Sequence, residues 1–511
     1  MNRARIAAAF DRAASALAGD DATVVAARGF LAEVRAQLGR RQRIALAGRI
    51  SSGKSTLANA LLGADLAPTG ALELTFNVSR FRYGETPALT VHFTDGPPQH
   101  HELDELRRLA VRAAARDDEL RALLGRVDHL EVGLPDRGLA DFDLIDTPGL
   151  DSEYRADSAN ALRWLGRSAA DVTGLSVRHA SRADALILVF DRGLARTDAD
   201  LLVDFTRAGL GESGPVTTVG VLTKVEQYWP EHDDPLAQGR RVAGTLMGTA
   251  EAGRLLFDLR PLASLVGAGA ALLRTVDLED LAALARLPAP RLLAPLRLGP
   301  VFAGRELPEL PVPRERRAAL HARLGGYGIA LACELIRAGC TTLDELRAAL
   351  GERSGLASFR QLLREHFASR SEVIVLDRAI RELRRLTGDP RLERAVAEVA
   401  ALEFQEHAFG ELATLRDHYA GRLAFGETET EDLLRITGER GRTPAARLGL
   451  PVHADAAQLA ERARARSEHW ALLDAYGVHT GRSRVAVRRV RRAYDVLLHE
   501  ISGRQAAGQR R

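Results

Sequence analysis

The sequence predicts a mostly parallel α/β domain joined to an all-helical region. Between residue 41 and about residue 270, short β-like runs alternate with helical patterns, which is typical of a parallel sheet covered on both faces. Beyond residue 316 the strand signals fade, and apolar residues such as Phe359, Leu363 and Phe367 recur at helical spacing. A chain of 511 residues is also long enough for two or three domains.

The elements are expected in the following order. Residues 1–40 show a helical pattern that breaks near Gly19. The segment 274–315 holds seven prolines and predicts a hinge or linker, because proline interrupts regular structure. We therefore expect N-terminal helices at 1–40, the α/β domain at 41–273, the linker at 274–315 and a helical region at 316–511. The expected strands are Arg43–Ala47, Thr75–Tyr83, Ala88–Thr94, Val127–Gly133, Asp141–Asp146, Ala183–Phe190 and Val216–Leu222.

The composition is that of an ordinary folded protein. Apolar residues make up 46% and charged residues 27%, which excludes disorder of the whole chain. A net charge of +3 creates no overall field toward nucleic acid, and two cysteines are too few for a disulfide framework. The N-terminus shows no signal peptide, and the apolar stretch 262–273 is too short to span a bilayer. A cytoplasmic protein is expected.

Lysine is almost absent from this sequence. Lys54 and Lys224 are the two lysines among 71 basic residues. Since arginine has replaced lysine elsewhere, these two positions indicate sites that need a compact ammonium on a flexible stem, although chance is the alternative. Both lie in motifs that bind nucleotides.

The first motif is a phosphate-binding loop. Residues 48–55 match G-x-x-x-x-G-K-[ST] at every specified position, after an expected strand and before an expected helix. Gly48 and Gly53 let the backbone wrap phosphates, Lys54 reaches the β- and γ-phosphates, and Ser55 ligates Mg²⁺. The remaining residues expected to bind the nucleotide here are Ser51, Ser52 and Thr56.

Two further motifs end later strands. Asp146-Thr147-Pro148-Gly149 places a carboxylate where it can hold Mg²⁺ and the Gly149 N–H where it can sense the γ-phosphate. Thr223-Lys224-Val225-Glu226 corresponds to the [NT]-K-x-D element that reads guanine, and its carboxylate can accept hydrogen bonds from the base. Glu226 is one methylene longer than the usual Asp. Together the motifs predict an α/β P-loop GTPase domain that prefers GTP to ATP.

The run from Ser51 to Gly63, followed by residues 66–70, resembles the dynamin superfamily. Residues 325–329, followed by residues 354–356 and a long helical pattern, resemble the actinobacterial dynamin-like group of the isoniazid-inducible type. Thr75 stands where many bacterial members carry a threonine. The resemblance implies that the helical pieces at 1–40 and 316–511 form a neck and stalk.

The resemblance also implies roles for single residues. Ser51 would contact the phosphates and a monovalent cation, and Thr75 would ligate Mg²⁺ and place the attacking water. Asp146 and Gly149 would sense the γ-phosphate, while Lys224 and Glu226 would read the base. Ile50 stands where eukaryotic dynamins often carry Gln, so hydrolysis is expected to be slow or to depend on Thr75 and a partner.

The function expected from the resemblance is GTP hydrolysis coupled to G-domain pairing and peripheral membrane remodelling. The partners would be a second copy or a related dynamin-like protein, and an anionic membrane at the inner face of the cell membrane. Two alternatives stay open. One is a hydrolysis-poor switch or scaffold partner of another dynamin-like protein, and the other is a GTPase of ribosome or nucleic-acid biology, against which the near-neutral charge weighs.

Three further segments allow two interpretations each. Six Arg between 482 and 492 flank an apolar stripe, which indicates either lipid binding or, preferably, a terminal helix docked with Arg outward. The apolar segments 262–273 and 289–303 fit equally a membrane contact or a place in the protein itself, either buried in the core or at an edge of the G domain. His100 and His101 are not expected to bind metal, and Cys333 and Cys340 are expected to be buried.

Overall fold

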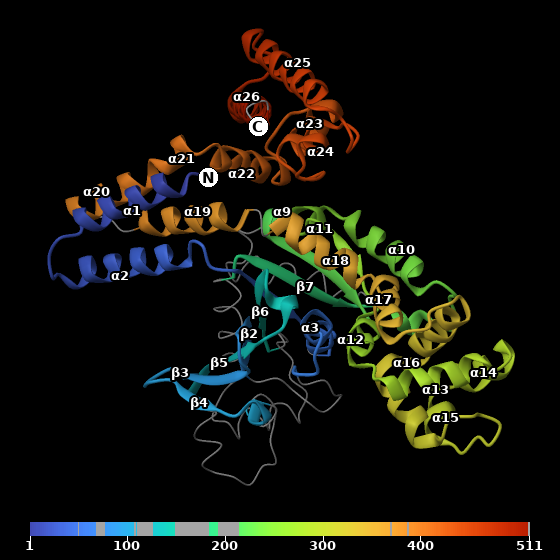
Figure 1. Cartoon of the computed structure of the whole chain (residues 1–511). Coiled ribbons are helices and arrows are strands. Elements are labelled where there is room, and N and C mark those ends of the chain that lie inside the picture. The colour runs from blue at the N-terminus through green and yellow to red at the C-terminus, as the bar shows by residue number, and fades with distance from the viewer. Residues whose placement is uncertain are drawn as a thin grey trace. The chain divides into compact units, whose positions relative to one another are not determined.

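A nine-stranded sheet organises residues 41–362 in the computed structural model of the chain (Figure 1). The structure describes residues 1–49, 51–67, 77–106, 109, 126–148, 183–192, 214–367, 370–385 and 388–508. Two units form, the α/β unit of residues 41–362 and the helical unit of residues 1–40 and 363–511.

The sheet has the strand order β4-β3-β5-β2-β6-β1-β7-β8-β9. Strands β6, β1, β7, β8 and β9 run parallel, β2 is antiparallel to β6, and β3 is antiparallel to both β4 and β5. The expected mostly parallel sheet is therefore confirmed. The strands are β1 (Gln42–Gly48), β2 (Val78–Tyr83), β3 (Ala88–Phe93), β4 (Gln99–His101), β5 (Val127–Leu134), β6 (Phe142–Asp146), β7 (Ala185–Asp191), β8 (Thr218–Thr223) and β9 (Leu259–Pro261).

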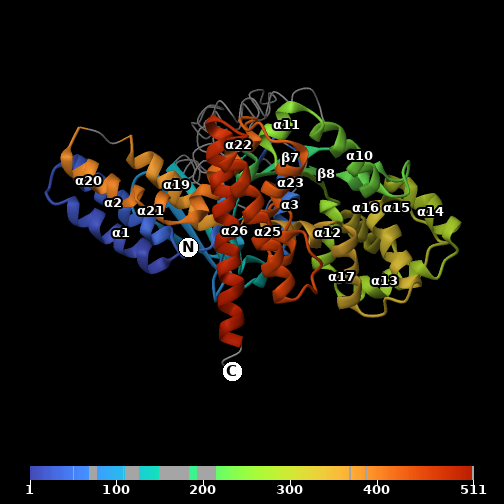
Figure 2. The same cartoon turned by 90° about the horizontal axis from the view of Figure 1, so that it is seen from above.

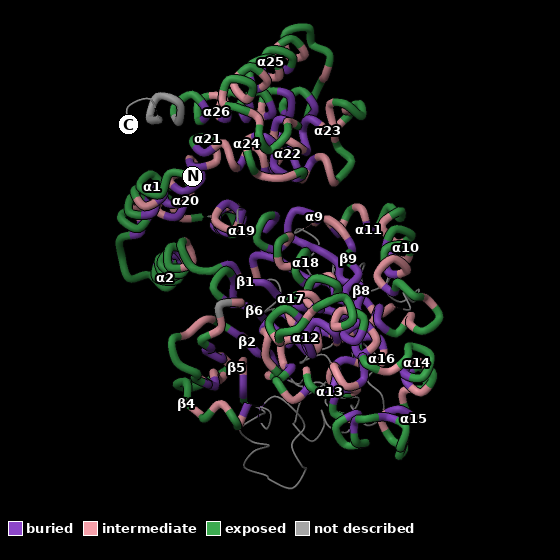
Figure 3. The backbone as a smooth tube through the Cα atoms, turned by 45° about the vertical axis from the view of Figure 1, so that its right-hand side comes forward, coloured by how far each residue is buried: buried purple, intermediate pink, exposed green. Residues whose placement is uncertain are grey.

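The central strands are buried on both faces, as Figure 3 shows for this unit. Every residue of β6 and β8 is buried, as is typical of strands inside a mostly parallel sheet. The sequence analysis missed β4 and β9, because three residues are too few to show an alternating pattern. The sequence also shows helical patterns at 102–124 and 197–208, but most of the first and all of the second lie outside the described residues.

The prediction of a linker at 274–315 is wrong. This segment contains α13 (Thr275–Ala285), α14 (Ala289–Arg297) and α15 (Gly299–Gly304), whose apolar residues join the core of the α/β unit. The buried guanidinium of Arg317 donates to the carbonyl oxygens of Phe302, Val312 (3.0 Å) and Arg305 (2.7 Å). These bonds fasten the segment to the next helix.

The prolines misled the prediction because most of them stand at helix starts. Pro290 and Pro300 occupy the first turns of α14 and α15, and Pro313 caps α16. A proline in a first turn loses no intrahelical hydrogen bond, so it begins a helix rather than breaking one.

The α/β unit also extends past the expected boundary at 273, to residue 362. The apolar segment 262–273 forms α12, which is buried and packs against α3 and α16. Burial in the core is therefore the correct one of its two interpretations. The remaining helices of this unit are α3 (Lys54–Leu62), α9 (Gly214–Thr217), α10 (Pro235–Met247), α11 (Ala250–Leu255), α12 (Ser264–Leu272), α16 (Arg314–Arg337), α17 (Leu343–Arg353) and α18 (Leu356–Leu362).

In the helical unit, the N-terminal helices pack with later ones: α1 lies against α20, and α2 against α19. The unit contains α1 (Arg3–Ala16), α2 (Ala22–Gln37), α19 (Ser371–Leu383), α20 (Pro390–Ala400), α21 (Leu402–Gln405), α22 (His407–Tyr419), α23 (Glu427–Ile436), α24 (Pro444–Leu448), α25 (Ala456–Ala475) and α26 (Gly481–Gly508).

The basic terminal helix docks, as the preferred interpretation predicted. Helix α26 runs beside α25 (Figure 2) and buries its stripe of Val487, Val490, Tyr494, Leu497 and Ile501. Its arginines face outward, and Arg484 and Arg488 pair with Asp474 at 3.1 and 2.9 Å.

Candidate functional site

The loop between β1 and α3 wraps tightly because its two motif glycines have no side chain. A Cβ on Gly48 would lie 2.5 Å from the carbonyl oxygen of Val189, and Gly53 has a φ of +95°, which favours glycine. Ser51 also takes a left-handed conformation, with a φ of +61°. The loop therefore presents its backbone at the N-terminus of α3, where unpaired N–H groups favour an anion.

Lys54 is the first residue of α3, and its side chain reaches back to this loop. The residue is buried, and its Nζ donates to the carbonyl oxygens of Gly48 (3.1 Å) and Arg49 (2.7 Å). A buried ammonium held by its own loop is a strong local source of positive charge. Ser52 lies beside it with a buried Oγ that has no hydrogen-bond partner among the described residues. The site thus offers a cation and an unused hydroxyl to a ligand.

Ser55, in the first turn of α3, meets Asp146 at the end of β6. The Ser55 Oγ donates to the Asp146 Oδ2 at 3.3 Å, while the Asp146 Oδ1 is buried without a partner among the described residues. Burial raises the pKa of Asp146 to about 6, against the opposing effects of Lys54 and Ser55. A hydroxyl beside a carboxylate with an unsatisfied oxygen fits Mg²⁺, which prefers oxygen ligands.

The end of β8 is tied to the phosphate-binding loop. The Thr223 hydroxyl lies within hydrogen-bond distance of the carbonyl oxygens of Ser52 and Phe190, the latter at 3.0 Å. Thr223 thereby holds the loop against β7 and β8, and it aligns the two sequence motifs that were expected to share one nucleotide.

Lys224 and Glu226 point to different partners. Lys224, with a φ of +58°, donates from Nζ to the Asp191 Oδ2 at 2.6 Å. The Glu226 Oε1 accepts from the backbone N of Leu265 at 3.4 Å, and its Oε2 is buried without a partner among the described residues. Burial raises the pKa of Glu226 to about 7, although the Leu265 N–H and Lys224 partly oppose it.

Asp191 is the site residue that the sequence analysis missed. It ends the apolar strand β7, and this is the same signal that identified Asp146 at the end of β6. Three expected residues, Ile50, Thr75 and Gly149, lie outside the described residues. Thr56 lies in the first turn of α3, close in sequence to Lys54 and Ser55.

Across the part of the chain that the structure describes, no helix combines the length and apolarity needed to cross a bilayer.

Comparison with known proteins extends this description. A profile of the dynamin family matches residues 44–225. Isoniazid-induced protein IniC of Mycobacterium tuberculosis is 30% identical over 482 residues, which cover 93% of this chain and 93% of that protein. Dynamin-like protein 2 of Campylobacter jejuni is 34% identical over 122 residues, 24% of this chain and 19% of that protein.

A solved structure described as "An oligomerised bacterial dynamin pair provides a mechanism for the long range sensing and tethering of membranes" aligns with 93% of this chain and 84% of that one, at 15% identity and a TM-score of 0.31. The profile covers the nucleotide-binding motifs, and the relative from M. tuberculosis carries the likeness over nearly the whole chain. The chain therefore belongs to the dynamin family of GTPases, among its bacterial dynamin-like members.

Proposed function

We propose that this chain binds GTP with Mg²⁺ and hydrolyses its terminal phosphate bond. The observation that carries the proposal is the buried ammonium of Lys54. It is held by two carbonyl oxygens of the loop that leads into the N-terminus of α3, where backbone N–H groups favour an anion. The direct test is phosphate release from GTP by the full chain, measured with and without Mg²⁺.

The residues of the chain divide the work of hydrolysis. Lys54 exchanges its carbonyl partners for phosphate oxygens and stabilises the negative charge that develops there. The Ser55 hydroxyl and the Asp146 carboxylate would hold Mg²⁺, which neutralises phosphate charge when it is bound. By resemblance, Ser51 contacts the phosphates and a monovalent cation, Thr75 places the attacking water, and Gly149 senses the γ-phosphate.

Guanine recognition is assigned to Glu226, assisted by Lys224. Two features support this role: the Glu226 Oε2 has no hydrogen-bond partner among the described residues, and Lys224 is restrained by Asp191. An ionised carboxylate accepts both N–H donors of guanine, whereas adenine lacks this donor pair. Since the pKa of Glu226 is about 7, only part of the Glu226 carboxyl groups are ionised near neutral pH and able to accept both hydrogen bonds from guanine.

This assignment predicts that GTP affinity depends on pH. Affinity should fall about tenfold between about pH 8 and about pH 6, because protonation removes the acceptor. Glu226→Gln should lose most of this pH dependence, apart from the part that Asp146 contributes near pH 6, and at least about tenfold in selectivity for GTP over ATP. Fluorescent-nucleotide titrations across this pH range provide the measurement.

Asp191→Asn is the matched control, because it releases Lys224 and leaves the Glu226 carboxylate in place. It should keep the pH profile, because the titrating carboxylate remains, whereas GTP affinity should fall because Lys224 is no longer restrained. A Glu226→Gln variant that retained both the pH profile and the preference for GTP would show that another group reads the base.

The mechanical output proposed here is nucleotide-dependent pairing of G domains, with a second copy or a related dynamin-like protein, coupled to peripheral contact with an anionic membrane.

One surface of the helical unit supports the membrane contact. At the turn from α25 to α26, Leu472, Tyr476 and Val478 are 53, 79 and 57% exposed, and we call these three residues the apolar tip. Arg484 and Arg488 follow directly on α26; both are exposed and share the single carboxylate of Asp474, so the group keeps a net positive charge. Apolar side chains beside arginines favour an interface of anionic lipid headgroups.

Replacing the apolar tip should weaken membrane binding. The variant Leu472→Ser, Tyr476→Ser, Val478→Ser should lose at least about tenfold in affinity for anionic liposomes in flotation, since burying each large apolar side chain contributes about 1.5–3 kcal/mol. GTP hydrolysis without liposomes should be unchanged. Val452→Ser is the control, because Val452 is 90% exposed but lies before α25, at its other end. Equal flotation of all three proteins would refute the role of the tip.

The alternative is a hydrolysis-poor switch or scaffold, and Ile50 and Glu226 are the two residues that suggest it. GTP binding without turnover, both alone and with anionic liposomes, would favour this alternative.

A further inference from the structure

Three potential metal ligands gather on one face of the sheet, away from the phosphate-binding loop. His92 on β3 and His129 on β5 are direct cross-strand partners, and Glu131 follows two residues later on β5. Since side chains alternate between the faces of a strand, all three lie on the same face. Their ligand atoms lie within 4.8 Å of one another.

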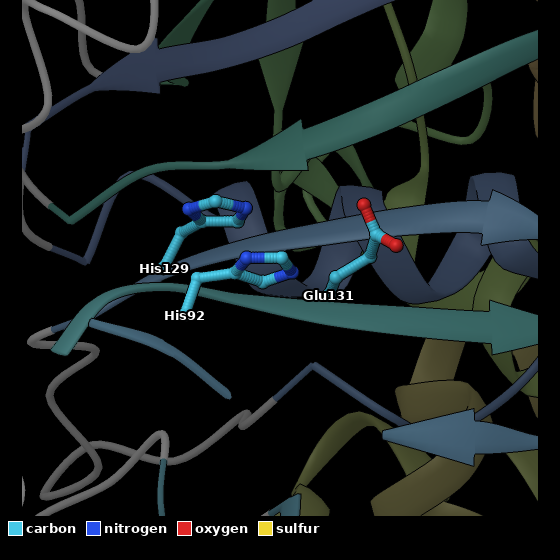
Figure 4. A group of neighbouring side chains, drawn as sticks. All are labelled: His92, His129 and Glu131. Atoms are coloured by element: carbon cyan, nitrogen blue, oxygen red, sulfur yellow. The ribbon is translucent and has the colours of Figure 1, made fainter. Parts of the chain in front are cut away.

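Figure 4 shows the two imidazole rings one over the other, with the Glu131 carboxylate beside them. The ring centroids are 4.3 Å apart and the planes differ by 5°. The His92 Nε2 is buried and has no hydrogen-bond partner among the described residues. A buried ring nitrogen without a partner is costly, and a bound ion would satisfy it.

The surroundings orient the ligands. The His129 Nδ1 lies 2.9 Å from the Asp128 Oδ2, and a carboxylate on one nitrogen commonly fixes the ring of a metal-binding histidine. On β3 the regular pairing with β5 shifts directly after His92. Such an irregularity changes the direction of the neighbouring side chain. It lies directly beside the two stacked imidazole rings.

The charges around the cluster leave room for a divalent cation. Glu131 is paired with Arg82 at 2.8 Å and with Arg80 at 3.4 Å, but Arg80 also bonds to Asp143 at 2.7 Å. Arg80 can therefore release Glu131 and keep a carboxylate partner.

We propose that His92, His129 and Glu131 bind a zinc-class transition-metal ion, with water as the fourth ligand. Two imidazoles and one carboxylate form a ligand set that suits Zn²⁺ and does not suit Mg²⁺ or Ca²⁺. Parallel stacked rings cannot both aim an in-plane lone pair at one ion. Binding therefore requires the two rings to rotate out of the stack, and bonds of about 2.0–2.1 Å draw the ligand atoms closer than they lie without metal.

The ion would join the sheet margin to its interior, because β3 and β4 are the last two strands on that side and β5 is the next. The site is distinct from the Mg²⁺ ligands: Asp146 pairs with Ser79 on β2, and Ser79 pairs with Leu130 on β5. His129 thus lies two strands away from Asp146. The proposal is independent of nucleotide binding.

The test uses the full chain stripped with a chelator and titrated with ZnCl₂ by calorimetry, in excess Mg²⁺ and without nucleotide. We expect one equivalent of zinc to bind and to raise the melting temperature. His92→Ala and His129→Ala should each weaken this binding by at least about tenfold, and Glu131→Gln should weaken it as well. Titration with Co²⁺ should give the visible absorption of a four-coordinate site in the wild-type chain and not in His92→Ala.

His100→Ala is the matched control. His100 lies on the adjacent strand β4, where its Nδ1 lies 3.2 Å from the Thr90 Oγ1, and its loss should leave zinc binding unchanged. Circular dichroism verifies that each variant is folded. The proposal is overturned if the wild-type chain takes up no zinc, or if a folded His92→Ala variant binds zinc as the wild type does.

Discussion

Lys54→Ala is expected to abolish nucleotide binding at working concentrations. The substitution removes the buried ammonium that faces the phosphates and leaves the Gly48 and Arg49 carbonyls without their donor. Truncating one partner of a buried, hydrogen-bonded charge pair costs about 2–5 kcal/mol, which corresponds to a loss of roughly 30- to 4,000-fold in affinity. Calorimetric titration with GTP and Mg²⁺ measures this loss directly.

Lys54→Arg provides the comparison, since it keeps the charge but replaces the compact ammonium with a planar guanidinium. We expect it to bind GTP far more weakly than the wild type, because the loop has little room around the buried Nζ. Melting curves must show that both variants are folded. If folded Lys54→Ala binds GTP within about threefold of the wild type, the assignment of the phosphate site is wrong.

Asp146→Asn is expected to have opposite effects on activity and on stability. It removes a carboxylate assigned to Mg²⁺, so hydrolysis should fall by about 100-fold or more. Folding raises the pKa of Asp146 to about 6, above its unfolded value of about 3.9, so the folded state binds the proton more tightly. Ionisation therefore costs stability as the pH rises from about 4 to about 6, and the cost is complete above that range.

At pH 7–8, Asp146→Asn should thus raise the free energy of unfolding of the nucleotide-free chain by up to about 3 kcal/mol. Denaturant unfolding without nucleotide and phosphate release with GTP measure the two effects. Asp143→Asn, on the same strand, is the matched control: it removes the partner of Arg80 and should lower stability by about 1–3 kcal/mol without changing hydrolysis. Loss of stability in Asp146→Asn would contradict the argument.

The sequence predicted the parts of the fold that local patterns encode. The phosphate-binding loop, the parallel strands and the docked stripe of α26 depend on residues within a few positions of one another. The extent of the α/β unit could not be predicted in this way. The spacing of prolines at 274–315 is compatible both with a linker and with short helices that begin with proline. Only the contacts in the folded chain, such as those of Phe302 and Arg317, distinguish the two structures.

The same limit applies to the candidate site. Lys54, Ser55 and Asp146 were predictable because each belongs to a sequence motif that has a fixed position at the start of a helix or the end of a strand. The pairing of Lys224 with Asp191 depends on β7 and β8 being neighbours, and the cross-strand pair of His92 and His129 depends on register. Order and register are properties of the assembled sheet, so neither contact has a signature in the sequence.

The way the Gly48 and Arg49 carbonyls hold Lys54 has a consequence for turnover. Because these acceptors belong to the loop itself, the buried ammonium is already hydrogen-bonded before a phosphate reaches it. The two carbonyl oxygens thereby offset part of the cost of burying its charge. We therefore expect the nucleotide-free chain to stay folded and to bind GTP without the help of a second protein.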